Sequence, residues 1–181
     1  MKLQSQNLYL IVINVSKDIA PAVPNLPGGL KDRERVKQFL IDRLGVPQSH
    51  VTTLSDKNAT RHNIIDAFRK RFANLPEGSI ALFHFSGHGS WEKTSAEFVE
   101  AGIEAPGGKN ETLVPYDGGN SGNKNITDKE LRLLVAELQV DQPTPFVALL
   151  DCCHSSSQFR NAVSDTGSSL FRSRLRPGNQ K

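Results

Sequence analysis

Short apolar runs alternate along this chain with longer segments whose apolar residues recur at helical spacing. Four runs predict buried strands, and three periodic segments predict helices. This alternation is typical of an α/β fold with a mainly parallel sheet and helices on both faces. The strands are expected at 8–15, 50–54, 80–86 and 146–150, and the helices at 30–44, after the N-cap residue Thr60, and after the capping-box pattern Thr127-Asp128-Lys129-Glu130.

Two stretches show no such pattern. Residues 87–125 are rich in glycine and aperiodic, so we expect a long loop there. From residue 155 onward the chain is rich in serine, asparagine and arginine, which predicts a flexible segment. We therefore expect one folded domain over 1–158 and a basic tail or inter-subunit linker over 159–181.

Composition fits a single globular domain. The 181 residues are 37% hydrophobic and 23% charged, which is enough to bury a sizeable core. No apolar stretch approaches the ~20 residues that a membrane span needs, so we expect no membrane association. The only two cysteines are adjacent and cannot form an ordinary structural disulfide with each other. This pattern favours a reducing, cytoplasmic environment.

The net charge of +3 comes from the end of the chain. Five basic residues and one acidic residue follow position 159, which leaves the rest of the chain nearly neutral. This tail lacks the clustered basic face with aromatic or groove-reading elements that nucleic-acid binding requires. We expect no nucleic-acid partner.

Two of the predicted strands end abruptly in reactive polar residues. His88 lies between two glycines just after the strand at 80–86, and Cys153 follows the strand at 146–150. Because parallel strands end at the same edge of a sheet, we expect His88 and Cys153 to face one crevice. A thiol beside an imidazole makes a nucleophile with its proton acceptor. The backbone N–H groups of Gly89 and Cys153 are candidates for an oxyanion hole.

Other interpretations remain open at this point. His88 can be a loop histidine at a strand end, and Cys153 can be a buried, unreactive thiol. A zinc site would use the adjacent cysteines with nearby histidines, but adjacent cysteines do not match the spacing of structural zinc sites.

The two motifs resemble the signature segments of the metacaspases and the bacterial caspase-like peptidases (orthocaspases). The motifs are Ser86-Gly87-His88-Gly89 and Asp151-Cys152-Cys153-His154-Ser155, with Ser156 where the family carries a glycine. The resemblance implies a three-layer caspase-like fold whose p20-like catalytic domain is 1–158. It also implies a cysteine endopeptidase in which Cys153, rather than Cys152, forms the acyl-enzyme and His88 is the base.

The resemblance further implies cleavage after arginine or lysine. Its S1 pocket residues would be Asp32, Ser86 and Asp151, and two carboxylates favour a guanidinium or ammonium group. For Asp32, compensation of a helix dipole is the alternative role. For Asp151, the alternative role is a loop cap.

Many members of this family bind calcium through several aspartates, one of them shortly after the nucleophile. Residues 155–160 contain no acid here. Asp117 and Asp128 are the remaining candidates, and two carboxylates make a thin site for a hard cation. We therefore expect that no cofactor is required.

The resemblance also implies a protein or peptide substrate and a smaller, p10-like half with two more strands. We expect a partner chain or segment to supply that half. The chain ends in Lys181, a residue after which such a peptidase would cut, so autoprocessing is expected. An inactive caspase-like scaffold is the alternative function.

Overall fold

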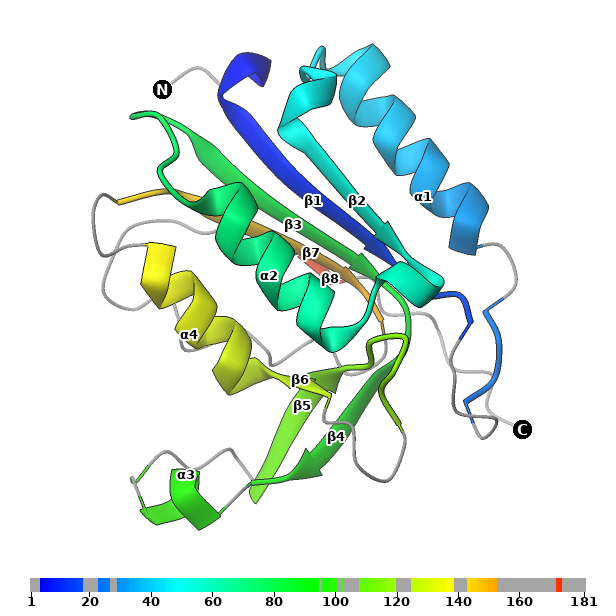
Figure 1. Cartoon of the computed structure of the whole chain (residues 1–181), viewed down its shortest axis with the longest axis vertical. Helices are drawn as coiled ribbons and strands as arrows, with labels where there is room; N and C mark the ends of the chain where they lie inside the picture. The colour runs from blue at the N-terminus through cyan, green and yellow to red at the C-terminus, as the bar shows by residue number, and fades with distance from the viewer. Residues whose placement is uncertain are drawn as a thin grey trace.

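A parallel sheet forms the centre of the computed structural model, which describes residues 4–17, 23–26, 29–94, 96–100, 102, 108–119, 125–138, 143–152 and 172–173. The strand order is β2–β1–β3–β7–β8, and all paired neighbours are parallel (Figure 1). A second, antiparallel sheet has the order β4–β5–β6. The strands are β1 (Leu8–Asn14), β2 (Val51–Ser55), β3 (Ile80–Ser86), β4 (Gly89–Lys93), β5 (Lys109–Leu113), β6 (Ile126–Thr127), β7 (Phe146–Asp151) and β8 (Arg172–Ser173).

Helices lie on both faces of the main sheet. Figure 1 shows α2 and α4 side by side on one face, and α1 lies over β1 and β2 on the other. The helices are α1 (Gly29–Gln38), α2 (Arg61–Phe72), α3 (Ala96–Glu100) and α4 (Asp128–Leu138). Shorter helical turns cover Ser5–Asn7, Phe39–Arg43, Gln48–His50 and Asp56–Asn58.

The two faces of the sheet bury two separate cores, because successive strand residues point to opposite faces. Phe68 of α2 and Phe83 of β3 belong to the larger core, beneath α2 and α4. Leu10 and Val12 of β1 belong to the smaller one, beneath Leu40. The predicted three-layer α/β fold with helices on both faces is therefore confirmed.

Local signals in the sequence predicted most elements closely. The Thr60 side chain accepts a hydrogen bond from the Asn63 N–H at 3.2 Å and caps α2. The capping box also forms. The Glu130 N–H donates to Thr127 Oγ1 at 3.1 Å, and the Thr127 N–H donates to Glu130 Oε2 at 3.0 Å.

Three expectations differ from the structure. The stretch 87–125 is not one long loop, because it contains β4, α3 and β5. Its strands are short and mostly polar, so no apolar run marks them. The helix expected at 30–44 is α1 followed by a π-helical turn, and Gly45 ends it at φ +68°. Within 159–181, the described residues Arg172–Ser173 form β8 beside Leu149 and Leu150.

Among the described residues, no helix combines the length and apolar character needed to cross a membrane.

Candidate active site

Three polar residues form a row across the carboxyl ends of the central strands. Asn14 of β1 is in register with Ser86 of β3, which is in register with Asp151 of β7. Asn14 and Ser86 are buried, whereas Asp151 is exposed. By strand alternation, all three lie on the face that α1 covers. A row of polar groups at the end of three apolar strands is the usual place for a site in such a sheet.

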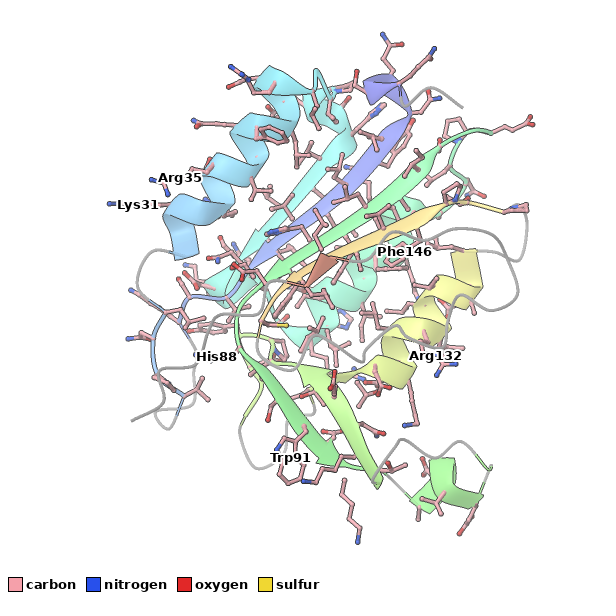
Figure 2. The ribbon with its side chains drawn as sticks, turned by 180° about the vertical axis from the view of Figure 1, so that it is seen from behind. Lys31, Arg35, His88, Trp91, Arg132 and Phe146 are labelled. Atoms are coloured by element: carbon pink, nitrogen blue, oxygen red, sulfur yellow. The ribbon has the colours of Figure 1, made fainter. Side chains whose placement is uncertain are left out.

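His88 lies just beyond this row, at the junction of the two sheets. The Gly87 N–H donates to the Asp151 carbonyl at 3.3 Å, which joins the end of β3 to the end of β7. The His88 carbonyl accepts from the Val114 N–H at 3.0 Å, just after β5. Figure 2 shows His88 where β3 passes into β4. The backbone on both sides of the imidazole is therefore fixed.

Gly87 lies where the packing leaves little room for a side chain. It is buried, and a Cβ atom added there would lie 3.0 Å from the Phe85 ring and 3.3 Å from Val15 Cβ. Real Cβ contacts are almost never shorter than this. A glycine before His88 thus lets the chain turn tightly over the core.

The imidazole of His88 is oriented by a backbone carbonyl. Its Nε2 lies 2.7 Å from the Pro24 oxygen. A carbonyl oxygen can only accept, so Nε2 carries the proton of the neutral ring. Nδ1 is therefore the nitrogen that is left to accept a proton from a nucleophile.

The loop that carries Pro24 is anchored to the end of β2. The Leu26 N–H donates to the Ser16 carbonyl at 2.8 Å. The Asp56 carboxylate accepts from the backbone N–H groups of Ser16 at 2.8 Å and Lys17 at 3.0 Å. Asp56 takes φ +41°, which is unusual for a residue other than glycine. These bonds fix the chain on both sides of the segment that reaches His88.

The structure brings together only part of the predicted site. His88, Gly89, Ser86 and Asp151 lie at one edge of the sheet, as expected from the strand order. Cys153 lies outside the described residues. Asp32 lies in the first turn of α1, and its side chain is also outside the described part.

Cys152 and His84 have different surroundings from the predicted pair. Cys152 is half-buried and packs against the larger core. His84 is buried in β3, and burial lowers its pKa, with a smaller opposing effect from Asp151. A neutral imidazole inside the sheet is not poised for proton transfer at the edge.

The two calcium candidates, Asp117 and Asp128, lie at the starts of two different helices. Asp117 Oδ1 accepts from the Arg61 N–H at 2.8 Å, at the start of α2. Asp128 begins α4, next to the buried Lys129. In the part of the chain that is described, no group of three or more His, Cys, Asp or Glu side chains could hold a metal ion.

Two residues at this edge were missed by the sequence analysis. Pro24 acts through its backbone carbonyl, so its residue type gives no signal. Asn14 did give one, because it ends an otherwise apolar strand and is almost fully buried. Its Nδ2 lies 3.5 Å from the Ser86 carbonyl, and its Oδ1 has no hydrogen-bond partner among the described residues.

A cavity of about 520 Å³ lies away from this edge, by the carboxyl ends of α2 and α4. Phe72, Leu75 and Leu138 are among its lining residues, and none of the predicted site residues lines it. The candidate active site is therefore separate from this cavity.

Comparison with known proteins agrees with the two sequence motifs. A family model described as "Metacaspase, peptidase C14 domain" matches residues 9–161. Metacaspase-9 of Arabidopsis thaliana is 30% identical over 159 residues, which cover 84% of this chain and 45% of the relative. Metacaspase-1 of Schizosaccharomyces pombe is 29% identical over 140 residues, which cover 72% of this chain and 30% of the relative. The chain thus spans less than half the length of these relatives.

Among solved structures, the fold is similar to that of protein GSU0716 from Geobacter sulfurreducens. The TM-score is 0.58 at 23% identity, and the match covers 82% of this chain and 51% of that chain. At this identity, the similarity concerns the fold alone.

Proposed function

Because the chain belongs to the metacaspase, peptidase C14 family, we propose that it is a cysteine endopeptidase with Cys153 as nucleophile and His88 as base. The Cys153 sulfur attacks the scissile carbonyl, and its proton passes to His88 Nδ1. The tetrahedral intermediate collapses to an acyl-enzyme, and the leaving amine takes the proton from His88. Water, deprotonated by His88, then hydrolyses the thioester and restores the thiol.

One observation carries this proposal. The hydrogen bond from His88 Nε2 to the Pro24 carbonyl, at 2.7 Å, selects the tautomer in which Nδ1 can act as the base. The same carbonyl stabilises the imidazolium that forms when Nδ1 takes a proton. In this role it resembles the third group that orients the base in other nucleophile–histidine pairs.

The surroundings of Cys152 support the choice of the second cysteine. Cys152 packs against the larger core, on the side of the sheet covered by α2 and α4. The polar row of Asn14, Ser86 and Asp151 lies on the opposite face. Because a nucleophile must face the substrate rather than the core, these surroundings favour Cys153 over Cys152.

Gly89 has the geometry of an oxyanion donor. Gly89 pairs with Leu113, and the bond from the Val114 N–H to the His88 carbonyl makes this a non-hydrogen-bonded pair. Its N–H therefore points away from β5, and β4 is the edge strand of the small sheet. An N–H outside the ladder and next to the base can stabilise a developing oxyanion, together with that of Cys153.

We further propose that the substrate residue before the cut is arginine or lysine. Ser86 and Asp151 are neighbours on the face covered by α1, and Asp32 is in the first turn of that helix. One exposed carboxylate beside a buried hydroxyl already favours a cation, and a second from Asp32 would allow bidentate binding of arginine. The same specificity would allow the enzyme to cut its own basic segment, 159–181.

The outer edge of β7 supports a further partner strand. Among the described residues, β7 pairs on that side only with the two-residue β8, at Leu149 and Leu150. A sheet edge with open backbone groups accepts an additional strand readily. The p10-like half of the family fold, from a partner chain or segment, would extend the sheet there.

The function is tested with fluorogenic peptides that differ only in the residue before the cut. We expect cleavage after arginine and lysine and none after aspartate, with Cys153→Ala inactive. Cys152→Ala is the matched control, because it removes the adjacent thiol, and it should keep at least about half of the activity. Cleavage after aspartate would overturn the pocket assignment. A wild-type protein that neither cleaves any peptide nor reacts with an electrophilic peptide at Cys153 would favour the scaffold function.

A further inference from the structure

Lys129 is a buried lysine in an unfavourable place. Its side chain is 7% exposed, whereas lysine is almost never buried without a partner. It also lies in the first turn of α4, where the unpaired N–H groups disfavour a positive charge. Two costs at one position require specific interactions that offset them.

The Lys129 ammonium contacts a buried oxygen atom of the small sheet. Its Nζ donates to Asn110 Oδ1 of β5. The Thr94 hydroxyl, just after β4, donates to the same oxygen at 3.1 Å. Asn110 and Thr94 are 1% and 6% exposed, so the group is closed to solvent.

A neighbouring acidic group interacts with the Lys129 charge. Asp128 precedes Lys129, and its Oδ1 is buried with no hydrogen-bond partner among the described residues. Burial raises the pKa of Asp128, and the Lys129 charge is the largest of the opposing effects. The half-buried Asp128 carboxylate and the amide oxygen of Asn110 are hard oxygen donors, of the kind that a cation prefers.

The cluster ties together the parts of the small sheet next to His88. Asn110 is in β5, whose end is followed by Val114, the donor to the His88 carbonyl. Thr94 directly follows β4, the strand that begins at Gly89. Figure 1 shows α4 starting beside β5 and β6, below the main sheet. A cation at this junction therefore links α4 to the strands that lead away from His88.

We propose that the Lys129 ammonium is the built-in structural cation of this cluster and holds the small sheet against α4 without a divalent metal. The ammonium fills the place between Asn110 Oδ1 and the start of α4 that a metal ion with the same oxygen donors would need. The fold then does not depend on calcium. This role of Lys129 in stability does not depend on the proposed function.

Two substitutions separate the charge from the space that the side chain fills. Lys129→Met keeps most of the volume and removes the charge. Lys129→Asp replaces the ammonium with a second carboxylate, next to Asp128 in the sequence, that can attract a cation from solution. In this variant, a calcium ion from solution should take the place of the lost ammonium group. Lys93→Asp is the matched control, because Lys93 is an exposed lysine on β4 of the same sheet.

The test is thermal unfolding of the full chain with millimolar calcium or with chelator. We expect the wild-type midpoint to be the same in both. Lys129→Met should unfold at least about 5 °C lower in both, since it leaves buried oxygens without their cation. Lys129→Asp should unfold lower with chelator and recover at least about half of the loss with calcium, whereas Lys93→Asp should not respond. If Lys129→Asp is recovered folded only with calcium, the same conclusion holds.

Three results would decide against the proposal. A wild-type midpoint raised by calcium would show that the cluster takes a metal beside the lysine. An unchanged midpoint in Lys129→Met would show that the ammonium stabilises nothing. A Lys129→Asp variant that calcium does not stabilise would show that this is not a cation position. If that variant gains calcium-dependent stability while no variant or wild type cleaves peptide, the cation assignment stands and the proposed function fails.

Discussion

His88 Nε2 lies 2.7 Å from the carbonyl oxygen of Pro24, a residue 64 positions earlier in the chain. The bond joins the segment after β1 to the segment after β3, above the carboxyl ends of two neighbouring strands. Because the acceptor belongs to the backbone, the orientation of the imidazole depends on the path of the loop rather than on a side chain. Residues that hold this loop should therefore affect the base without touching it.

Asp56→Ala tests that dependence. The substitution removes the acceptor of the Ser16 and Lys17 N–H groups, so the loop that carries Pro24 is released. We expect kcat for an arginine peptide to fall by about 10-fold or more with little change in KM, because misplacement of a catalytic group weakens the chemical step. Asp56→Asn, which keeps an acceptor oxygen and tolerates a positive φ, should retain most of the rate. Equal losses in both variants would contradict a role through these bonds.

Gly87→Ala tests the tight packing before the base. The added methyl group would meet the Phe85 ring at 3.0 Å, so the ring or the chain must move by a few tenths of an ångström. We expect a loss of about 1–3 kcal/mol in the free energy of unfolding, measured with denaturant, and a lower kcat. The double variant with Phe85→Leu should recover part of both losses, because the smaller side chain gives way. If the two substitutions were simply additive, the steric explanation would be wrong.

The main sheet and its strand order could be predicted because they depend on strong local signals. The apolar run of β3 ends at Ser86, where the strand ends, and the capping box at Thr127 starts α4. Once strands and helices alternate, right-handed crossovers leave few arrangements. The side-by-side ends of β3 and β7 followed from this alone.

The small sheet could not be predicted in the same way. β4 is an edge strand, and its Trp91 is half exposed and held by the Lys109 ammonium at 3.8 Å from the ring centre. Such a strand is stabilised by its partner across the hairpin, which a local pattern does not reveal. The Pro24 contact and the Lys129 cluster also depend on distant residues. Both are tertiary contacts, which a local sequence pattern does not reveal.

Thr127→Ala tests the start of α4. It removes the hydroxyl that accepts from the Glu130 N–H and leaves that helical donor without its cap. We expect the free energy of unfolding to fall by about 1 kcal/mol, as is usual for the loss of an N-cap. Thr127→Ser keeps the acceptor and should lose less than half as much. Denaturant unfolding of the three proteins measures the difference, and equal stability of wild type and Thr127→Ala would contradict the capping role.

His84 gives the protein a predictable sensitivity to acid. It lies in register with Val12 and Leu149, inside the sheet, and its Nδ1 has no hydrogen-bond partner among the described residues. Burial lowers its pKa below the usual 6.5, and the nearby Asp151 opposes this only in part. The folded state therefore favours the neutral imidazole of His84 over the charged one.

Replacement of His84 by leucine should remove this sensitivity. Below pH 6.5 the unfolded chain binds a proton at His84 that the folded chain does not, so stability falls as the pH falls. The slope from this group is at most about 1.4 kcal/mol per pH unit. We expect wild type to lose stability between pH 6.5 and 5 more steeply than His84→Leu in urea unfolding at several pH values. His62→Gln, at an exposed position on α2, should follow wild type. Equal slopes for wild type and His84→Leu would show that the buried imidazole is protonated in the folded protein.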